Sequence, residues 1–472
     1  MTDRIETDLC IIGGGSGGLS VAAGAAQMGA PTVLIEGGKM GGDCLNYGCV
    51  PSKSLLAAGH YASAWKGSAR FGVEMGEPKV DFARVNDHVR DVIAGIEPHD
   101  SQERFEGFGV KVFRDKARFV SANEVQTGDT VIKARRIVVA TGSSPVAPAI
   151  PGLDQVDYLT NETLFDNREL PGHLIIIGGG PIGMEMAQAH ANLGARVTVL
   201  EARKAFSKDD PELASIALDG VRESGVVIRE GVSIARVEPG PAVVLEDAGG
   251  TEERIEGTHL LVAAGRKANV EGLDLAKAGI DFTDRGIKVD KGLRTTNRKV
   301  YAIGDVAGGL QFTHVAGYHA GLVIRSALFR LPVSNDTSAT PWVTYTDPEL
   351  AWVGMQEDDA RKQHGDSIET LTWGFDENDR ARAERRTEGR VKVVVHKGKP
   401  IGAGIVGVHA GELIGPWVLA ISKGLKLSDM AGFIAPYPTL GEVNKRAAGS
   451  YYTPKLFSDR TRMVVKFLRM FG

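Results

Sequence analysis

Two short apolar runs frame a stretch of small residues at the start of the chain. The run at residues 8–12 predicts a buried strand, and the run at 32–35 predicts a second one. Between them, residues 13–18 form a glycine-rich turn, and the small residues 19–28 predict a helix. The order strand, turn, helix, strand predicts a βαβ unit, which places the two strands parallel in one sheet.

The same pattern returns 165 residues later. A run of apolar residues at 174–177 leads into a second glycine-rich turn, and the strand predicted at 196–200 ends at Glu201, as the first unit ends at Glu36. Each glutamate lies 23 positions after the first glycine of its turn. This internal repeat is the strongest signal of overall organisation in the sequence.

Both turns match the G-x-G-x-x-G pattern of dinucleotide-binding sites. The glycines allow a tight turn, the following helix N-terminus attracts a pyrophosphate, and the acidic residue accepts hydrogen bonds from a ribose. We therefore predict two dinucleotide sites, made by Gly13, Gly15, Gly18 and Glu36 in the first unit and by Gly178, Gly180, Gly183 and Glu201 in the second.

Elsewhere the pattern predicts helix at 80–105, short strands at 110–133, and a mixed α+β region from about residue 340. Three apolar strands end in turns, at Thr141-Gly142, at Gly265-Arg266 and at Gly304-Asp305. Open α/β sheets bind ligands at the carboxyl ends of their strands, so we expect Asp305 to face a ligand. A turn or a helix N-cap is its alternative role.

Composition narrows the possible functions. The 472 residues carry 55 Lys and Arg against 59 Asp and Glu, a net charge of -4, which argues against a nucleic-acid-binding protein. Three cysteines do not make a secreted disulfide framework. We find neither a signal peptide nor an apolar run long enough to span a membrane, so we expect a cytoplasmic protein.

Two of the three cysteines lie five positions apart in the segment GGDCLNYGCVPSK, at Cys44 and Cys49. In a reducing compartment such a pair is more often catalytic than structural, and a short loop makes a weak covalent constraint. Lys53 follows on the same face of a predicted helix, where its charge favours a thiolate. We interpret the cysteines as a redox-active pair, and Cys10 as a core residue inside a strand.

This segment closely resembles the active site of the flavoprotein disulfide reductases, a family that includes dihydrolipoamide dehydrogenase, glutathione reductase and mercuric reductase. The resemblance covers nearly the whole chain. It implies an α/β fold with two Rossmann-like domains, for FAD and NAD(P), and a C-terminal α+β dimerisation domain. We expect the boundaries 1–150 for the first part of the FAD domain, 151–270 for the NAD(P) domain, 271–338 for the central part of the FAD domain and 339–472 for the dimerisation domain.

The resemblance also implies roles for single residues. Cys44 is the interchange thiol, Cys49 the flavin-contacting sulfur, and Lys53 the lysine near the flavin, with Glu185 as its partner. It implies an FAD site that includes Lys53, Thr141, Gly142, Gly304, Asp305 and His314, and it adds Gly265 to the NAD(P) site. We assign no metal ligands. For His314 and His319, a packing role is the commoner alternative.

Glu201 favours NADH over NADPH, because a carboxylate suits a free 2′-hydroxyl and repels a 2′-phosphate. Arg203 and Lys204 follow it and leave NADPH as an alternative.

The C-terminal segment departs from the family pattern. Lipoamide and glutathione reductases carry H-P-T-x-x-E, whose histidine serves the partner subunit's site. Here Tyr437 stands in the histidine position, before Pro438 and Thr439, and Glu442 matches the glutamate. Tyrosine has an ordinary pKa near 10 and is a poor base at neutral pH. Mercuric reductases share the tyrosine, but this chain lacks their C-terminal cysteine pair.

We therefore predict a homodimeric FAD-dependent NAD(P)H oxidoreductase with an active site shared between subunits, passing electrons to a small-molecule or protein disulfide or to a metal ion. Two alternatives stay open: a redox-linked flavoprotein subunit or regulatory protein, and a diaphorase or oxidase that uses the flavin alone. The basic, apolar segment 460–471 predicts a terminal helix, packed on the dimerisation domain or lying on a membrane surface.

Overall fold

The computed structural model describes residues 3–471. The chain divides into two compact units, each assembled from several stretches of sequence. The first comprises residues 1–179, 189–202 and 228–336, and the second comprises residues 180–188, 203–227 and 337–472. The division runs through the second repeat. Most of its strands belong to the first unit, whereas helix α8 (Pro211–Glu223) and the first part of α7 (Pro181–Asn192) belong to the second.

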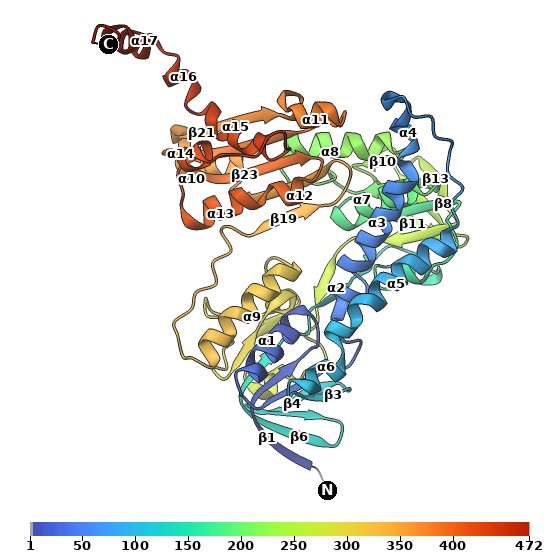
Figure 1. Ribbon diagram of the computed structural model, residues 1–472. Coiled ribbons are helices and arrows are strands. Elements are labelled where there is room, and N and C mark those ends of the chain that lie inside the picture. Colours follow the sequence, from blue (N-terminus) through green and yellow to red (C-terminus); the bar gives the residue numbers. More distant parts are fainter. Residues whose placement is uncertain (1–2, 472) are drawn as a thin grey trace. The chain divides into compact units, whose positions relative to one another are not determined.

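A seven-stranded sheet forms the main layer of the first unit (Figure 1). Its strand order is β3-β2-β1-β6-β5-β4, and β18 pairs with β6. The strands that carry the first repeat, β1 (Asp3–Ile12) and β2 (Thr32–Ile35), are parallel, with Ile12 opposite Ile35. β6 (Thr130–Val139) lies parallel to β1 on its other side. The predicted βαβ unit is therefore confirmed.

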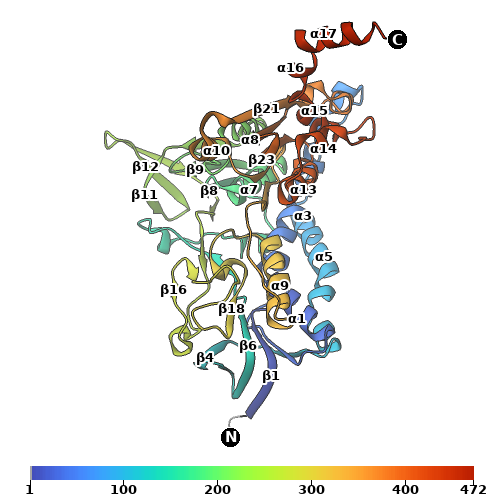
Figure 2. The ribbon, with the colours of Figure 1, turned by 90° about the vertical axis from the view of Figure 1, so that its left-hand side faces the viewer.

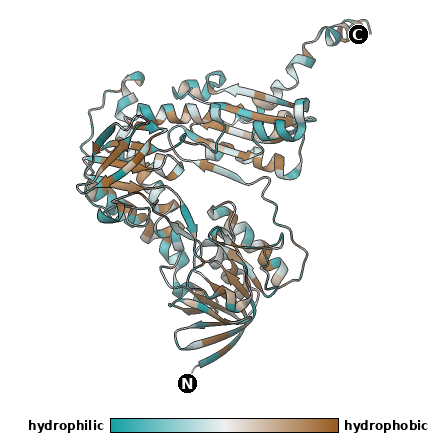
Figure 3. Cartoon of the chain, turned by 180° about the vertical axis from the view of Figure 1, so that it is seen from behind, coloured by the Kyte–Doolittle hydropathy of each residue, from teal (hydrophilic) through white to brown (hydrophobic). Residues whose placement is uncertain are grey.

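The burial of these strands follows from their apolar runs. Leu9, Ile11 and Leu34 pack against α1 and α9, whereas Cys10 and Ile12 contribute to the cluster on the opposite face of the sheet. A parallel sheet covered on both faces needs such uninterrupted apolar strands. Figure 3 shows these strands as hydrophobic along their central part. Cys10 is fully buried, and burial raises the pKa of its thiol to about 12, so its predicted place in the core is confirmed.

The remaining elements of the first unit follow in chain order. They are α1 (Ser16–Gln27), α2 (Gly42–Asn46), α3 (Cys49–Ser63), α4 (Trp65–Ser68), α5 (Phe82–Asp100), α6 (Gln102–Gly107), β3 (Lys111–Phe113), β4 (Ala117–Ser121), β5 (Glu124–Thr127), β7 (Ser143–Pro145), β8 (His173–Ile177), β9 (Arg196–Glu201), β11 (Ser233–Glu238), β12 (Ala242–Glu246), β13 (Glu252–Glu256), β14 (His259–Val262), β15 (Arg266–Ala268), β16 (Phe282–Thr283), β17 (Gly286–Ile287), β18 (Val300–Ala302) and α9 (Thr313–Ala327).

The second repeat builds its own parallel sheet. Its strand order is β10-β9-β8-β14, where β10 spans Val227–Glu230. Leu174 in β8 lies opposite Val197 in β9, and β14 runs parallel to β8 on the other side. A separate antiparallel sheet, β11-β12-β13, packs its apolar side chains with those of these strands in one cluster. The relation of β8 to β9 and β14 repeats that of β1 to β2 and β6.

An antiparallel five-stranded sheet organises the second unit, in the order β19-β20-β23-β22-β21 (Figure 2). The strands are β19 (Pro341–Thr344), β20 (Glu349–Gly354), β21 (Ile368–Gly374), β22 (Arg390–His396) and β23 (Lys399–Gly407). The helices are α10 (Glu357–His364), α11 (Asp379–Ala383), α12 (Ala410–Leu413), α13 (Gly415–Lys423), α14 (Leu427–Gly432), α15 (Glu442–Ser450), α16 (Thr453–Leu456) and α17 (Asp459–Leu468). The predicted α+β character of this region is confirmed.

Each face of this sheet has its own packing. Val393 and Ile405 join α13, α14 and α15 in one core around the buried Trp417. On the β20–β23 pair, Trp352 lies opposite Gly404, and a Cβ at Gly404 would lie 2.6 Å from Leu213 of α8. The indole of Trp352 therefore requires glycine at position 404, because any side chain there would displace both Trp352 and α8.

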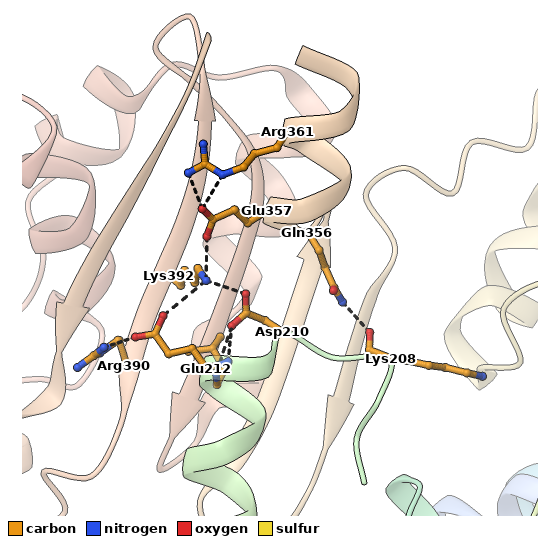
Figure 4. A network of polar contacts seen from close by, with 9 residues as sticks. Lys208, Asp210, Glu212, Gln356, Glu357, Arg361, Arg390 and Lys392 are labelled. Carbon is orange, nitrogen blue, oxygen red and sulfur yellow. Dashed lines mark hydrogen bonds and ion pairs between the residues drawn. The ribbon is translucent and has the colours of Figure 1, made fainter. Parts of the chain in front are cut away.

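A buried lysine fastens the start of α8 to the sheet (Figure 4). Lys392 Nζ on β22 lies 2.8 Å from Asp210 Oδ2 and 3.0 Å from Glu357 Oε2. Asp210 also accepts the backbone N–H groups of Glu212 and Leu213 and so caps α8. Burial opposes the charged form of Lys392, but the hydrogen bonds to Asp210 and Glu357 outweigh it, and the pKa of the lysine is raised.

We predict that Lys392→Met lowers the free energy of unfolding of this unit by about 3–5 kcal/mol, because it leaves the buried carboxylate of Asp210 without its cation. Urea denaturation followed by tryptophan fluorescence measures the change, since four of the five tryptophans lie in this unit. Lys362→Met is the matched control. Lys362 pairs with Asp359 on the surface, and its loss should cost less than about 1 kcal/mol. Equal effects of the two substitutions would contradict the prediction.

Candidate active site

The first glycine-rich turn has the geometry that a bound pyrophosphate requires. Gly13 has a φ of +110°, and a Cβ there would collide with the carbonyl of Ala140 at the end of β6. A Cβ at Gly18 would collide with the carbonyl of Gly13, so α1 packs directly on the turn. Helix α1 begins at Ser16 and presents its first N–H groups at this turn.

Glu36 closes the same turn from the end of β2. Its Oε2 accepts a hydrogen bond from the N–H of Gly14. The second turn uses the same atoms: Glu201 Oε2 accepts from the N–H of Gly179 at 2.7 Å. Gly178 has a φ of +118°, and a Cβ there would lie 2.5 Å from the carbonyl of Ala263 at the end of β14. The sequence repeat is therefore a repeat of hydrogen bonds and close contacts. Gly180 and Gly183 lie at the start of α7.

The redox segment is attached to the first turn through glycines. Gly15 and Gly41 form an isolated parallel bridge, and the N–H of Gly41 donates to the carbonyl of Gly14 at 2.9 Å. Gly42 has a φ of +59°, and a Cβ there would lie 2.7 Å from the Cα of Gly15. The two backbones thus touch, which sets the start of α2 against the dinucleotide turn.

The two cysteines occupy adjoining short helices. Cys44 lies within α2, and Cys49 is the first residue of α3. The thiols hydrogen bond to each other, and Thr313 Oγ1 at the start of α9 lies 3.5 Å from Cys49 Sγ. Both thiols are free in the structure. A thiol at a helix N-terminus is stabilised as a thiolate, because the helix dipole places positive charge there.

The pKa values of the two thiols move apart. The hydrogen bond from Cys44 lowers the pKa of Cys49 to about 6, with further help from Thr313 and the charge of Lys53. The same hydrogen bond, together with burial, raises the pKa of Cys44. At neutral pH the pair therefore holds one thiolate, on Cys49, and one thiol, on Cys44.

A polar network joins the redox segment to Asp305, whose carboxylate is predicted to contact the flavin. Arg266 Nη2 lies 3.1 Å from Asp43 Oδ1, and its Nε donates to Ser143 Oγ at 2.8 Å. Ser143 in turn donates to Asp305 Oδ2 at 2.6 Å. Burial raises the pKa of Asp305, although Ser143 and Arg266 act in the opposite direction. Asn161 Nδ2 donates to Asp43 Oδ1 at 3.1 Å and completes the network.

The site residues predicted from the sequence did not include Asp43, Ser143, Asn161 or Arg266. The available signal was their position beside predicted site residues: Arg266 follows Gly265, and Ser143 follows Gly142. The β7–β15 ladder brings these two turns together, with Arg266 opposite Pro145. Thr141 is held there as well, since its Oγ1 donates to the carbonyl of Asn269 at 2.7 Å.

The two histidines near Asp305 differ in environment. His319 is buried in α9 and its Nδ1 accepts the N–H of Gly304 at 3.2 Å, which holds the turn before Asp305. Burial lowers the pKa of His319. His314, in the first turn of α9, stacks on Phe312 with ring centroids 5.2 Å apart.

Lys53 and Glu185 lie in different units. Lys53 is on α3, one helical turn after Cys49, with Nζ 3.4 Å from Ser52 Oγ. Glu185 is buried on α7 in the second unit, where its Oε1 accepts the N–H of Tyr345 at 2.9 Å. The predicted pairing of these two residues stays a prediction.

Tyr437 is exposed in the second unit and has an acidic neighbour. Its hydroxyl donates to Asp379 Oδ2 at 3.1 Å, and this hydrogen bond raises the pKa of Tyr437. Asn378 holds the segment of Tyr437 next to α11, since its side chain caps α11 and donates to the carbonyl of Thr439 at 3.1 Å. Tyr437 is therefore a stable hydrogen-bond donor at neutral pH. Glu442 is the first residue of α15.

Comparison with known proteins identifies the family. The model of the family "Pyridine nucleotide-disulphide oxidoreductase" matches residues 7–320, and the model of its dimerisation domain matches residues 340–448. The chain belongs to this family. Members use FAD and NAD(P)H, and the two dinucleotide turns fit that cofactor pair. The expected FAD- and NAD(P)H-dependent oxidoreductase and its α/β fold are confirmed, and the dimerisation domain supports a homodimer.

Known members of the family share most of the chain. A mercuric reductase of Bacillus cereus is 36% identical over 94% of this chain and 71% of its own length. A dihydrolipoyl dehydrogenase of Bacillus subtilis is 33% identical over 92% of this chain and 96% of its own length. Among solved structures, the Cu(II) complex of the HOCl-induced flavoprotein disulfide reductase RclA of Escherichia coli has a TM-score of 0.83 at 28% identity, covering 93% of this chain and 99% of that one.

We predict that reduced Cys49 reacts with iodoacetamide along a pH curve centred near 6, because its thiolate forms above that pH and is lost below it. Cys44→Ala removes the hydrogen bond that favours the thiolate and should shift the curve to higher pH. Mass spectrometry of the alkylated peptides measures both. Cys10 is the internal control, since its buried thiol should stay unmodified. An unshifted curve in Cys44→Ala would contradict the assigned cause.

Proposed function

We propose that this oxidoreductase takes electrons from NADH and delivers them, through the Cys44–Cys49 pair, to a disulfide or to a thiol-reactive metal ion. One observation carries the proposal: the cysteine pair, with its thiolate on Cys49, is attached through Gly15, Gly41 and Gly42 to the first dinucleotide turn. A pair at that place can exchange electrons with a flavin held by the same turn.

The cofactor contacts follow from the two turns. In the proposal, Gly13, Gly15, Gly18 and Glu36 hold the FAD pyrophosphate and ribose, and Asp305 binds its ribityl chain. The contributors at the flavin are Lys53, Glu185, Thr141, Gly142, Gly304 and His314, and those at the nicotinamide nucleotide are Gly178, Gly180, Gly183, Glu201 and Gly265. Bound FAD would supply the two-electron relay between the nicotinamide and the cysteine disulfide.

The chemistry of the cysteines balances in three steps. Two electrons and one proton convert the Cys44–Cys49 disulfide into the Cys44 thiol and the Cys49 thiolate, and the Cys44 proton then moves to Cys49. Cys44, as a thiolate, attacks one sulfur of an acceptor disulfide and forms a mixed disulfide, and the other sulfur leaves as a thiolate and takes a proton. Cys49 then attacks the sulfur of Cys44, which releases the second acceptor thiol and restores the original disulfide.

In this proposal Tyr437 of the partner subunit donates the proton to the leaving thiolate. Asp379 keeps the tyrosine protonated, which suits a proton donor and disfavours a general base. A metal-ion acceptor needs no such proton, because it accepts electrons from sulfur ligands directly. The relatives support both a disulfide and a metal ion as the class of acceptor. They include mercuric reductases, dihydrolipoyl dehydrogenases and a copper-bound RclA. We also place the protein in the cytoplasm, where thiol systems keep ordinary cysteines reduced.

We predict that Cys44→Ser abolishes NADH-dependent reduction of disulfides and metal ions while NADH still reduces the flavin. Tyr437→Phe should lower the turnover of disulfide acceptors by roughly 100-fold and leave metal-ion turnover nearly unchanged. A stopped-flow measurement of flavin reduction, beside steady-state assays with both acceptor classes, separates the steps.

The same assays decide between the alternatives. Full activity of Cys44→Ser toward dyes or oxygen alone would identify a flavin-only diaphorase or oxidase. Rapid flavin reduction without turnover of any acceptor would favour a redox-linked flavoprotein subunit or regulatory protein. Tyr452→Phe is the matched control for Tyr437→Phe, because it removes another tyrosine hydroxyl of the same unit to which the proposal gives no role.

We predict a higher kcat/KM with NADH than with NADPH. Glu201→Ala should lower kcat/KM for NADH about 10-fold, the effect of one lost hydrogen bond to a charged group, and should raise it for NADPH because the repulsion disappears. Arg203→Ala tests the alternative. If it selectively impairs NADPH and the native protein prefers NADPH, the assignment to NADH is wrong.

A further inference from the structure

The chain continues beyond the part matched by the family. The dimerisation-domain match ends at residue 448, and α16 and α17 follow it. Ser458 caps α17 by accepting the N–H of Thr461 at 3.3 Å, so the helix has a defined start. Figures 1 and 2 both show α17 standing clear of the five-stranded sheet and of its covering helices.

One side of this terminal helix is apolar and exposed. At 100° per residue, its apolar positions cover roughly half of the circumference. Every one of them is at least half exposed, from 50% for Val464 to 65% for Met463, and Met470 after the helix is 75% exposed. Phe467 and Phe471 pack against each other with ring centroids 5.1 Å apart. The apolar face of the helix comprises Met463, Val464, Val465, Phe467 and Leu468, and Met470 and Phe471 follow just after its end.

The other side is basic, and a fourth basic residue, Arg460 in the first turn, falls among the apolar positions. Arg462, Lys466 and Arg469 follow at spacings of four and three residues, which places them together on one face. From residue 451 to 471 the chain has five basic residues and one acidic residue, Asp459, whereas the whole protein has a net charge of -4. Positive charge is therefore concentrated in the terminal segment of an otherwise acidic chain.

We propose that α17 binds the surface of an anionic lipid bilayer, lying in the plane of the interface with its apolar face among the acyl chains. A basic face opposite a wide apolar face, with phenylalanines and methionines near the end, suits such an interface. A second copy of the helix would cover only a narrow seam of this apolar face, whereas a bilayer covers all of it. Binding here would hold the oxidoreductase beside a membrane.

Within residues 3–471 no helix is long and apolar enough to cross a bilayer, so the proposed contact is peripheral. Each basic residue near an anionic surface contributes a roughly fivefold factor in affinity. The two-residue change Arg462→Glu and Lys466→Glu should therefore weaken binding by about 30-fold or more, and added salt should weaken binding of the native protein.

Flotation of the FAD-loaded protein with phosphatidylcholine vesicles, with and without phosphatidylserine, tests the proposal. We expect the full chain to float only with the anionic vesicles. A chain ending at residue 458, Phe467→Glu and the charge-reversal variant should stay unbound. Met75→Glu, which changes an exposed methionine far from this helix in sequence, should float like the native protein. All variants should keep NADH-dependent flavin reduction, since α17 holds no residue of the proposed active site.

Equal recovery of the full chain and the truncated chain would overturn the proposal. The proposal would also fail if the full chain did not bind the vesicles and the truncated chain lost its dimeric state in light scattering. The helix would then cover a second copy of the protein. Binding that is equal on neutral and anionic vesicles would also contradict it, since the basic face would have no role.

Discussion

The contact between the backbones of Gly15 and Gly42 is the constraint on which the active site depends. A Cβ at Gly42 would lie 2.7 Å from the Cα of Gly15, so only glycine allows the redox segment to reach the dinucleotide turn. Cys44 follows Gly42 by two residues, so its position depends on that contact. The glycines of the turn therefore serve two purposes: they open the turn for a pyrophosphate, and they set where the cysteine pair lies.

The repeat explains why only one of the two turns carries cysteines. Both turns use a glycine N–H bound to a glutamate at the end of the second strand, at Gly14 with Glu36 and at Gly179 with Glu201. After Glu36 the chain turns back to touch its own glycine turn, whereas after Glu201 it proceeds to Asp210 and helix α8. The cysteine pair therefore accompanies the first turn, which is the proposed FAD site.

Patterns within about thirty residues predicted the strands, the turns, both glutamates and the cysteine pair, because glycine spacing and apolar runs are local signals. The network of Asp43, Asn161, Ser143 and Arg266 was not predictable in this way. Each of its contacts joins two positions more than a hundred residues apart in sequence, which meet through the sheet and the β7–β15 ladder. Asp379 beside Tyr437 was missed for the same reason. A single polar residue in a short helix has no local pattern that marks its partner.

The protonation states of Cys44, Cys49 and Tyr437 limit which group can act as the base in the proposed mechanism. An attacking Cys44 must lose its proton, yet its pKa is raised, and Tyr437 is held protonated by Asp379. The thiolate of Cys49 is then the base at hand, because the two sulfurs already share a hydrogen bond. Transfer along that bond makes Cys44 the nucleophile and leaves Cys49 as a thiol. In the proposed mechanism a tyrosine then takes the place of the histidine, provided that Tyr437 only returns a proton to the departing sulfur. In that mechanism the interaction between Cys44 and Cys49 governs the attack, and Tyr437 is needed only when the acceptor is a disulfide.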